Sequence, residues 1–440
     1  MTRHPSLAPA LVALALLGLA GTLGADGDGP NRAALVAGPL VGHTTPTSTR
    51  IWLLTRSPGP VTLELTRVGG EPATRSIPAA AKGAAQALVI PVKDLAPGTE
   101  YRYRLLRGET VLSGPHAFRT FPEASRADAK VTLAFGSCAH GERFPKQPIF
   151  RRIAADRPDA FLFLGDTVYL GRKDLKSPAA MRERYLHGRT RPAFAELARR
   201  VPCYAMWDDH DYGPNNADRR WEQKAAVREI FKEFWPNPSF GDGESGVWTR
   251  FRLGPVEVFL LDSRSFRDPD RAPDKPSKTM LGAAQKAWLL AALESSEATF
   301  KLVGIGGQVL ADYHRFDSYS KYHYERDELI KGIMTRGVQG VVFLTGDRHL
   351  SEILRTRRRK DRYPLYDITC SPLANIAWER GNELESPRRV FFYGKSVSYC
   401  LLTADRRELV VDFRDGEGRS VGGTRIRARE LRLGARDGPY

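Results

Sequence analysis

The feature that most constrains the fold is a series of apolar runs that each end in polar residues. Between positions 131 and 353 these runs alternate with stretches of helical spacing at 148–158, 193–200, 283–296 and 327–337. Apolar strands that alternate with helices indicate a layered α/β core. Ligands of open α/β sheets bind at the carboxyl ends of the strands, so we expect the terminal polar groups to share one pocket. These groups are Cys138, Asp166, Asp209 with His210, Gln308, and Asp347 with His349.

One of these endings, in the stretch 201–220, carries an unusual density of charge. It begins with the apolar sequence VPCYAMW and continues with Asp208, Asp209, His210 and Asp211. Acidic side chains packed this tightly repel each other unless a cation lies among them. A histidine inside such a cluster is either paired or bound to a metal. The stretch therefore predicts a metal site.

Residues 31–122 alternate short strands with turn clusters, which is typical of an all-β domain. Their run LAPGTEYRYRL resembles the Leu-x-Pro-Gly-Thr-x-Tyr signature of fibronectin type III domains. The resemblance implies a small fibronectin III or Ig-like β-sandwich, in which the hydroxyl of Tyr101 fixes a corner. After the polar connector 122–130 the α/β pattern starts, and we expect the strands beyond position 362 to complete a second sheet.

The chain is basic, with 67 Lys and Arg residues against 51 acids and a formal net charge of +16. This favours anionic partners, or is simply the charge of a soluble surface. The basic run RTRRRKDR at 355–362 follows the segment with Asp347 directly, so we expect it near the pocket mouth. There it would either capture a polyanionic substrate or form a solvated loop. No basic stripe interleaved with aromatic residues is visible, which argues against a stable nucleic-acid partner.

The first 25 residues read as a secretory signal peptide, with an apolar run at 7–24 and small residues before Asp26. We expect an exported protein (periplasmic, cell-surface or secreted) after cleavage. The run is also long enough to remain as an uncleaved anchor, since a span needs roughly 20 residues. Four scattered cysteines do not form a disulfide framework, although a bridge between Cys370 and Cys400 stays open.

Three residue types in the strand-end motifs suit a metal centre. Asp166 follows Gly165, which allows a tight backbone turn, and its two carboxylate oxygens can bridge two cations. Tyr169, three positions on, is either a ligand for ferric iron or a partly buried core residue. Cys138 can bind as the thiolate. His140, two residues after Cys138, either joins the same metal or lies exposed in a loop.

Four short motifs match one family in their order along the chain. GSC at 136–138, LGDTVY at 164–169, WDDHD at 207–211 and GDRH at 346–349 resemble the alkaline phosphatase D (PhoD-like) family of calcineurin-like metallophosphoesterases. The β-sandwich before the catalytic part is similar to that family's arrangement. The resemblance implies a metallophosphatase domain over 129–435, built as an α/β two-sheet sandwich flanked by helices.

The resemblance also implies a mixed-metal centre. Asp166 would bridge two metals, and Cys138, Tyr169 and His349 would hold iron, because thiolate, phenolate and imidazole suit that metal. The second ion would be calcium, which prefers oxygen ligands, although other divalent metals would also fit. Its ligands would be Asp209 and Asp347, with Gln308, Asn216 or His140 as further contacts to metal or phosphate.

The remaining residues of WDDHD receive roles from the same resemblance. His210 would contact the substrate and stabilise phosphate or protonate the leaving oxygen, and Asp211 would orient it. Asp208 has no assigned role. Two departures stand out: Gln308 falls where many metallophosphoesterases have a histidine ligand, and no arginine pair precedes the signal region.

The function expected from these features is an exported phosphoesterase that hydrolyses phosphomonoesters, phosphodiesters or both through a metal-activated water. Its partner would be a phosphate ester. A different class, a non-catalytic surface-binding protein that uses the β-sandwich, is the alternative. Loss of one metal motif would favour it, and all four motifs are intact.

Overall fold

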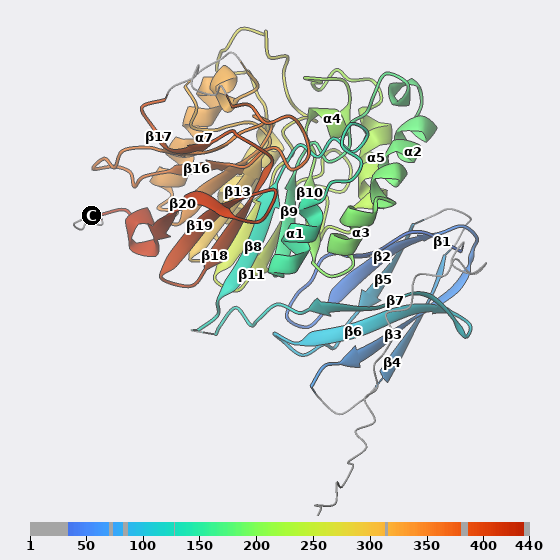
Figure 1. Cartoon of the computed structure of the whole chain (residues 1–440). Coiled ribbons are helices and arrows are strands. Elements are labelled where there is room, and N and C mark those ends of the chain that lie inside the picture. The colour runs from blue at the N-terminus through green and yellow to red at the C-terminus, as the bar shows by residue number, and fades with distance from the viewer. Residues whose placement is uncertain are drawn as a thin grey trace, which may run out of the picture.

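A computed structural model describes residues 34–69, 74–81, 87–126, 128–312, 316–379 and 386–434. The signal peptide expected at 1–25 lies outside these residues. Four sheets are present, with three, four, six and seven strands. The two smaller sheets form a separate body beside the larger α/β part (Figure 1). In the described part of the chain no helix has the length and apolarity that a membrane crossing requires.

The N-terminal body consists of two facing antiparallel sheets around one apolar core. The three-stranded sheet has the order β1-β2-β5 and the four-stranded sheet has the order β4-β3-β6-β7. The hydroxyl of Tyr101 accepts a hydrogen bond from the backbone N–H of Ala96 at 2.7 Å, the type of corner contact that the sequence predicts there. The strands are β1 (Leu35–Val41), β2 (Thr49–Thr55), β3 (Gly59–Arg67), β4 (Thr74–Ala81), β5 (Ala87–Val92), β6 (Glu100–Arg107) and β7 (Thr110–Arg119).

The larger part contains a six-stranded sheet, ordered β10-β9-β8-β18-β19-β20, and a seven-stranded sheet, ordered β11-β12-β13-β14-β16-β15-β17. Each has a parallel section, β10-β9-β8 in the first and β12-β13-β14-β16 in the second. Their inner faces share one hydrophobic core. The strands are β8 (Val131–Gly136), β9 (Ala160–Leu164), β10 (Cys203–Met206), β11 (Thr249–Leu253), β12 (Val256–Leu260), β13 (Phe300–Ile305), β14 (Val341–Thr345), β15 (Ser351–Arg355), β16 (Tyr366–Thr369), β17 (Arg389–Tyr393), β18 (Ser398–Ala404), β19 (Glu408–Asp415) and β20 (Ser420–Arg427).

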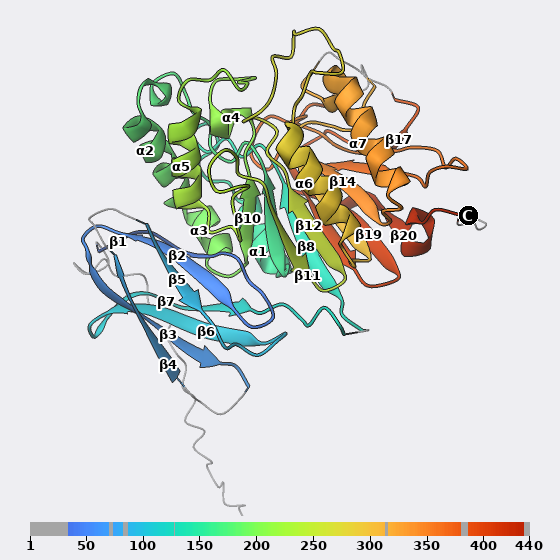
Figure 2. The same cartoon turned by 180° about the vertical axis from the view of Figure 1, so that it is seen from behind.

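Helices cover the outer face of each sheet, which gives the α/β layers expected from the sequence (Figures 1 and 2). Helices α1 and α3 pack on the six-stranded sheet, and α6 and α7 lie on the seven-stranded side. The helices are α1 (Ile149–Asp156), α2 (Pro178–Arg189), α3 (Pro192–Ala198), α4 (Asp209–Tyr212), α5 (Lys224–Phe234), α6 (Ala283–Glu294) and α7 (His323–Thr335), with 3₁₀ turns at Asp174–Lys176, Tyr319–Tyr322 and Ala428–Leu431.

The N-terminal body is joined to the larger part by buried contacts. The indole N–H of Trp52 donates to the carbonyl of Glu233 at 2.7 Å, and the hydroxyl of Tyr103 donates to the carbonyl of Arg199 at 2.8 Å. Both acceptors lie at or near the ends of helices on the six-stranded side. The β-sandwich therefore packs below these helices, at a distance from the carboxyl ends of the parallel strands (Figure 1).

Two expectations about the C-terminal part need correction. The strands beyond position 362 do not complete a single sheet, because β16 and β17 belong to the seven-stranded sheet and β18, β19 and β20 extend the six-stranded one. The bridge between Cys370 and Cys400 is absent: both residues are buried free cysteines. Each therefore serves as a small apolar core residue.

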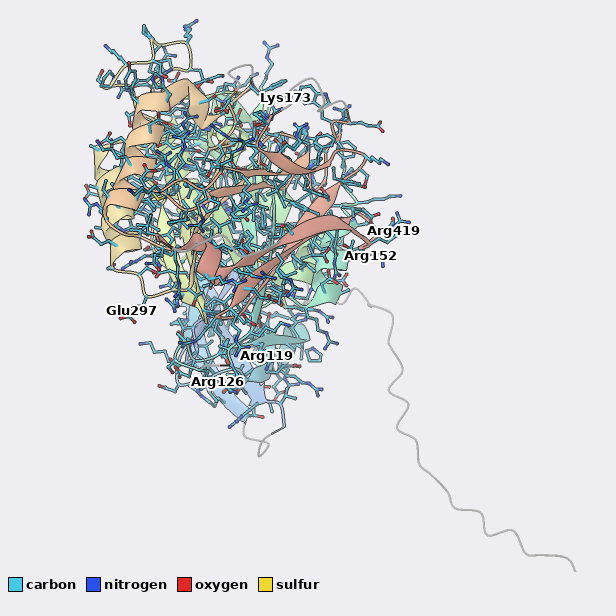
Figure 3. The ribbon with its side chains drawn as sticks, turned by 90° about the vertical axis from the view of Figure 1, so that its left-hand side faces the viewer. Arg119, Arg126, Arg152, Lys173, Glu297 and Arg419 are labelled. Atoms are coloured by element: carbon cyan, nitrogen blue, oxygen red, sulfur yellow. The ribbon has the colours of Figure 1, made fainter. Side chains whose placement is uncertain are left out.

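The expected position of the basic run 355–362 near the pocket mouth is wrong. Strand β15 runs antiparallel to β16 and carries the chain back to the opposite edge of the sheet. There Arg358 donates to the carbonyl of Glu430, and Tyr363 donates to the carbonyl of Val338, just before β14 starts. Basic side chains are also spread widely, since Arg126 lies near the N-terminal sheets and Lys173 lies at the far end (Figure 3).

Candidate metal centre

The parallel strands deliver the predicted groups to one edge of the two sheets. Cys138 follows β8, Asp166 follows β9, Asp209 follows β10, and Asp347 follows β14. The thiol of Cys138 lies 3.6 Å from Oδ2 of Asp166 and 3.7 Å from the carbonyl oxygen of Asp347. Residues from both sheets therefore meet at their carboxyl ends, as the sequence pattern predicts.

Two overlapping groups of side chains have the spacing of a metal site. The ligand atoms of Asp166, Asp209 and His210 lie within 4.8 Å of one another, and so do those of Asp208, Asp209 and Asp347. Asp209 belongs to both groups. The second group includes Asp208, which had no role in the sequence-based interpretation. The arrangement offers two adjacent cation positions that share Asp209.

A hydrogen-bonded chain extends the first group toward the remaining predicted ligands. The hydroxyl of Tyr169 donates to Oδ2 of Asp166 at 3.2 Å, and the amide of Asn375 donates to the same hydroxyl at 3.1 Å. The amide nitrogen of Asn375 also lies 3.5 Å from Nε2 of His349. Cys138, Tyr169 and His349 thus surround Asp166 directly or through Asn375.

The backbone at the predicted ligands adopts a conformation that L-residues seldom take. Cys138, Asp166, Asp347 and His349 all have φ between 54° and 64°... with Asp166 at 53°. A non-glycine residue in this left-handed region carries strain, which persists only where the surrounding structure fixes it, and such residues cluster at functional sites. The sharp turns aim the side chains of these residues out of the strand ends.

Buried acidic oxygens in the site lack hydrogen-bond donors within the described residues. Asp208 Oδ2 and Asp209 Oδ1 are both buried without such a donor. Burial and the charges of Asp209 and Asp208 raise the pKa of Asp166 well above its usual range, and burial raises the pKa of Asp208 to about 7. Clustered carboxylates of this kind are costly unless a cation compensates them. The donor set therefore fits metal ions.

Asp211 has a different role from the predicted one. Its carboxylate accepts the backbone N–H groups of Asp166 at 2.5 Å, Thr167 at 3.0 Å, Val168 at 2.8 Å and Asp208 at 3.0 Å. Both oxygens are used by the backbone, whereas the sequence-based hypothesis paired this residue with the ring of His210. Asp211 fixes the loop that carries Asp166 in place.

Replacement of this carboxylate by an amide should destabilise the protein. In Asp211→Asn the amide nitrogen faces two backbone donors, which lose their acceptor. A buried unsatisfied group costs about 1–3 kcal/mol, so we expect a loss of about 2 kcal/mol or more in the free energy of unfolding, measured with urea. Asp405→Asn is the control, because Asp405 accepts two backbone N–H groups at the surface. A loss in Asp211→Asn no greater than in the control would contradict the assignment.

Tyr169 lies between two histidine rings. The ring of His140 stacks on it at a centroid distance of 4.2 Å, and the ring of His210 stacks at 4.3 Å. Burial lowers the pKa of both histidines. Stacking explains the position of His140 without a metal contact, and it holds His210 beside Asp166, whose Oδ1 accepts the backbone N–H of His210 at 3.3 Å.

Two further predicted contacts point elsewhere. The side-chain amide of Gln308 donates to Glu352 at 2.5 Å and to Thr369 at 2.9 Å, so its partners lie in the seven-stranded sheet. Asn216 contributes its backbone N–H, which donates to Oδ2 of Asp209 at 2.6 Å, while the residue itself is exposed. Asn216 therefore positions a candidate ligand through its main chain.

The sequence-based analysis missed a buried ion pair behind the site. The guanidinium of Arg264 donates to Oδ1 of Asp208 and to Oδ2 of Asp317, at 2.5 Å in each case. All three side chains are buried. Arg264 follows the apolar strand β12 and Asn375 follows β16, so the rule of polar groups at strand ends would have indicated both residues.

Comparisons with known proteins agree with this geometry. The sequence profile of the PhoD-like phosphatases matches residues 133–387, which is more than half of the chain. The chain belongs to the PhoD-like phosphatase family. The matched range contains every candidate ligand described above. A second profile, of a domain of unknown function (DUF7800), matches residues 32–125, the range of the N-terminal sheets.

Two relatives of this PhoD-like chain illustrate the similarity. Alkaline phosphatase D of Bacillus subtilis (strain 168) is 25% identical over 305 residues, which cover 58% of this chain and 52% of that protein. This chain thus spans about half the length of that curated relative. The solved structure of PhoD has a TM-score of 0.75 at 19% identity, and the match covers 90% of this chain and 89% of that one. At this identity the structural match shows a shared fold.

Proposed function

We propose that this PhoD-like chain is a metal-dependent phosphoesterase, with its active centre at the strand ends described above. The observation that carries the proposal is the buried group of Asp208, Asp209 and Asp347, two of whose carboxylate oxygens lack a hydrogen-bond donor among the described residues. Such a group is unfavourable alone and favourable around a cation. Membership in a phosphatase family supplies the reaction class.

The donor chemistry supports two different metals. Cys138, Tyr169 and His349 offer thiolate, phenolate and imidazole, which suit iron, and Asp166 would bridge to the second position. Asp209 and Asp347 offer carboxylate oxygens, which suit calcium or another hard cation. Burial and the charge of Asp166 raise the pKa of the Cys138 thiol, so the thiolate forms only with a compensating cation. Iron-containing protein without a visible phenolate-to-iron absorption band would contradict the role of Tyr169.

The residues of the chain have distinct tasks in the proposed hydrolysis. Metals, when bound, supply the Lewis acidity that activates water and neutralises phosphoryl charge. His210 is held against Tyr169 with its ring at the edge of the centre. Because burial lowers its pKa, the ring is neutral near neutral pH and can donate one N–H to a phosphoryl or leaving oxygen. Asp211 keeps the backbone of Asp166 in place.

Hydrolysis assays with and without a chelator test the proposal. Purified protein is given 4-nitrophenyl phosphate and bis(4-nitrophenyl) phosphate, which separates monoesterase from diesterase activity. We expect activity on at least one ester, its loss in the presence of a chelator, and its return when metal is added back. Full turnover in protein from which all metal has been removed would refute metal dependence.

Two parts of the proposal concern the organisation of the chain. We assign residues 31–122 to a fibronectin III-like or Ig-like sandwich and residues 129–435 to the metallophosphatase domain; the separate sheets and the separate profile match over 32–125 support the division. We also assign residues 1–25 to an export signal. N-terminal sequencing of the exported protein tests this assignment, and an intact leader would argue for an anchor instead.

A further inference from the structure

A pocket of about 350 Å³ opens beside the metal centre. Its walls carry mostly apolar atoms. Ile376 is 54% exposed there, an unusual degree of exposure for a large aliphatic side chain. Within the described residues the pocket is lined by Phe316, Asp347, Arg348, His349, Ile376, Ala377 and Trp378.

The pocket is continuous with the centre because both share Asp347 and His349. The backbone N–H of Trp378 donates to the carbonyl of His349 at 2.7 Å. The segment that contains Trp378 begins at Asn375, whose amide contacts Tyr169 in the centre. A phosphoryl group held at the centre would therefore have its ester oxygen next to the pocket.

The aromatic walls are already arranged without a ligand. The rings of Phe316 and Trp378 meet edge to face, with centroids 4.7 Å apart and planes at 87°. The guanidinium carbon of Arg348 lies 4.0 Å from the centroid of Phe316 and 5.4 Å from that of Trp378. Contacts of this kind between cation and ring, and between rings at an edge, are favourable and directional. A planar aromatic group would extend this arrangement with little reorganisation.

We propose that this pocket, which we call the Trp378 subsite, binds the organic group of the substrate and selects phosphate esters of aromatic alcohols over those of small aliphatic ones. The inference rests on the proposed phosphoesterase function and specifies its substrate class. Trp378 and Ile376 supply apolar contact area, and Arg348 and Phe316 hold the walls in place. The metal centre binds the phosphoryl group common to all esters, whereas the subsite distinguishes their organic parts.

Competitive inhibition by two non-hydrolysable phosphonates tests the subsite apart from the chemistry. The metal-loaded protein hydrolyses 4-nitrophenyl phosphate in the presence of phenylphosphonate or methylphosphonate. Both inhibitors carry the same anionic group, so the ratio of their inhibition constants reports the organic group alone. We expect phenylphosphonate to bind about tenfold more tightly, which is about 1.4 kcal/mol. The ratio should fall toward one in Trp378→Ala and Ile376→Ser and persist in Trp378→Phe.

Val111→Ser is the matched control, because Val111 is an aliphatic residue of β7 that is 40% exposed and belongs to the N-terminal sheets. The control should keep the wild-type ratio. Ile376→Ser decides the result if Trp378→Ala does not fold, since its side chain is largely in solvent. Equal inhibition by both phosphonates in an active wild-type protein would overturn the subsite alone, and so would a ratio that neither variant changes. A metal-loaded protein that hydrolyses no ester would overturn the proposed function itself.

Discussion

Asp166→Asn should reduce turnover of 4-nitrophenyl phosphate by more than about 100-fold. Mutation of residues that merely support a metal ligand typically costs 10–100-fold, and Asp166 lies at the centre of the candidate ligands. Its Oδ2 is contacted by the thiol of Cys138 and the hydroxyl of Tyr169. An amide cannot bridge two cations as a carboxylate does. Steady-state kinetics and the metal content of the variant measure the loss.

Unfolding of the variant would not explain this loss. The pKa of Asp166 is raised by burial and by neighbouring acids, so its charge opposes folding when no metal is bound. The metal-free variant should therefore be at least as stable as the metal-free wild type. Asp367→Asn is the matched control: Asp367 is a fully buried carboxylate bonded to Thr345 and to the backbone of Val309. Wild-type activity in Asp166→Asn, or equal losses in both variants, would contradict the assignment.

Arg264→Met should lower the free energy of unfolding by about 3–5 kcal/mol, because it leaves two buried carboxylates without their cation. Arg264 is 1% exposed and bonds Asp208 and Asp317 together. Urea denaturation of the wild type and the variant measures the change. Arg336→Met is the control, since Arg336 forms an exposed pair with Glu294 at 2.6 Å. We expect the control to lose less than about 1 kcal/mol.

The same variant should alter the acid sensitivity of the protein. Although burial raises the pKa of Asp317, Arg267 and Arg264 together hold it below its usual range. A carboxylate with a lowered pKa contributes stability at higher pH, and that contribution is lost as the pH falls below about 4. Without Arg264 this contribution is smaller, so the variant should lose stability less steeply in acid than the wild type. Parallel pH profiles would count against the ion pair.

The sequence predicted the centre well where strand topology decides the outcome. Cys138, Asp166 and Asp347 each follow a parallel strand, and parallel strands place their carboxyl ends at one edge. Arg264 was missed because its pairing with Asp208 joins residues 56 positions apart and depends on how the two sheets face each other. Periodicity along the chain does not reveal that packing.

The two misplaced features have related causes. The basic run 355–362 follows β15, and nothing in its composition shows that this strand runs antiparallel to its neighbour β16. Gln308 was expected at the centre because it follows β13, but its amide is bonded to Glu352 and Thr369 on neighbouring strands. In both cases the residue type indicated charge or polarity correctly, while the partner depended on strand direction and side-chain packing.

The most direct test of the account is elemental analysis of active wild-type protein, made alongside its rate of ester hydrolysis. The account predicts at least one tightly held metal ion per chain, with activity that rises in proportion to metal content across partially stripped samples. Its donors are Asp166, Asp209 and Asp347, which lie together in the folded chain. Full hydrolytic activity in samples that contain far less than one metal ion per chain would contradict it.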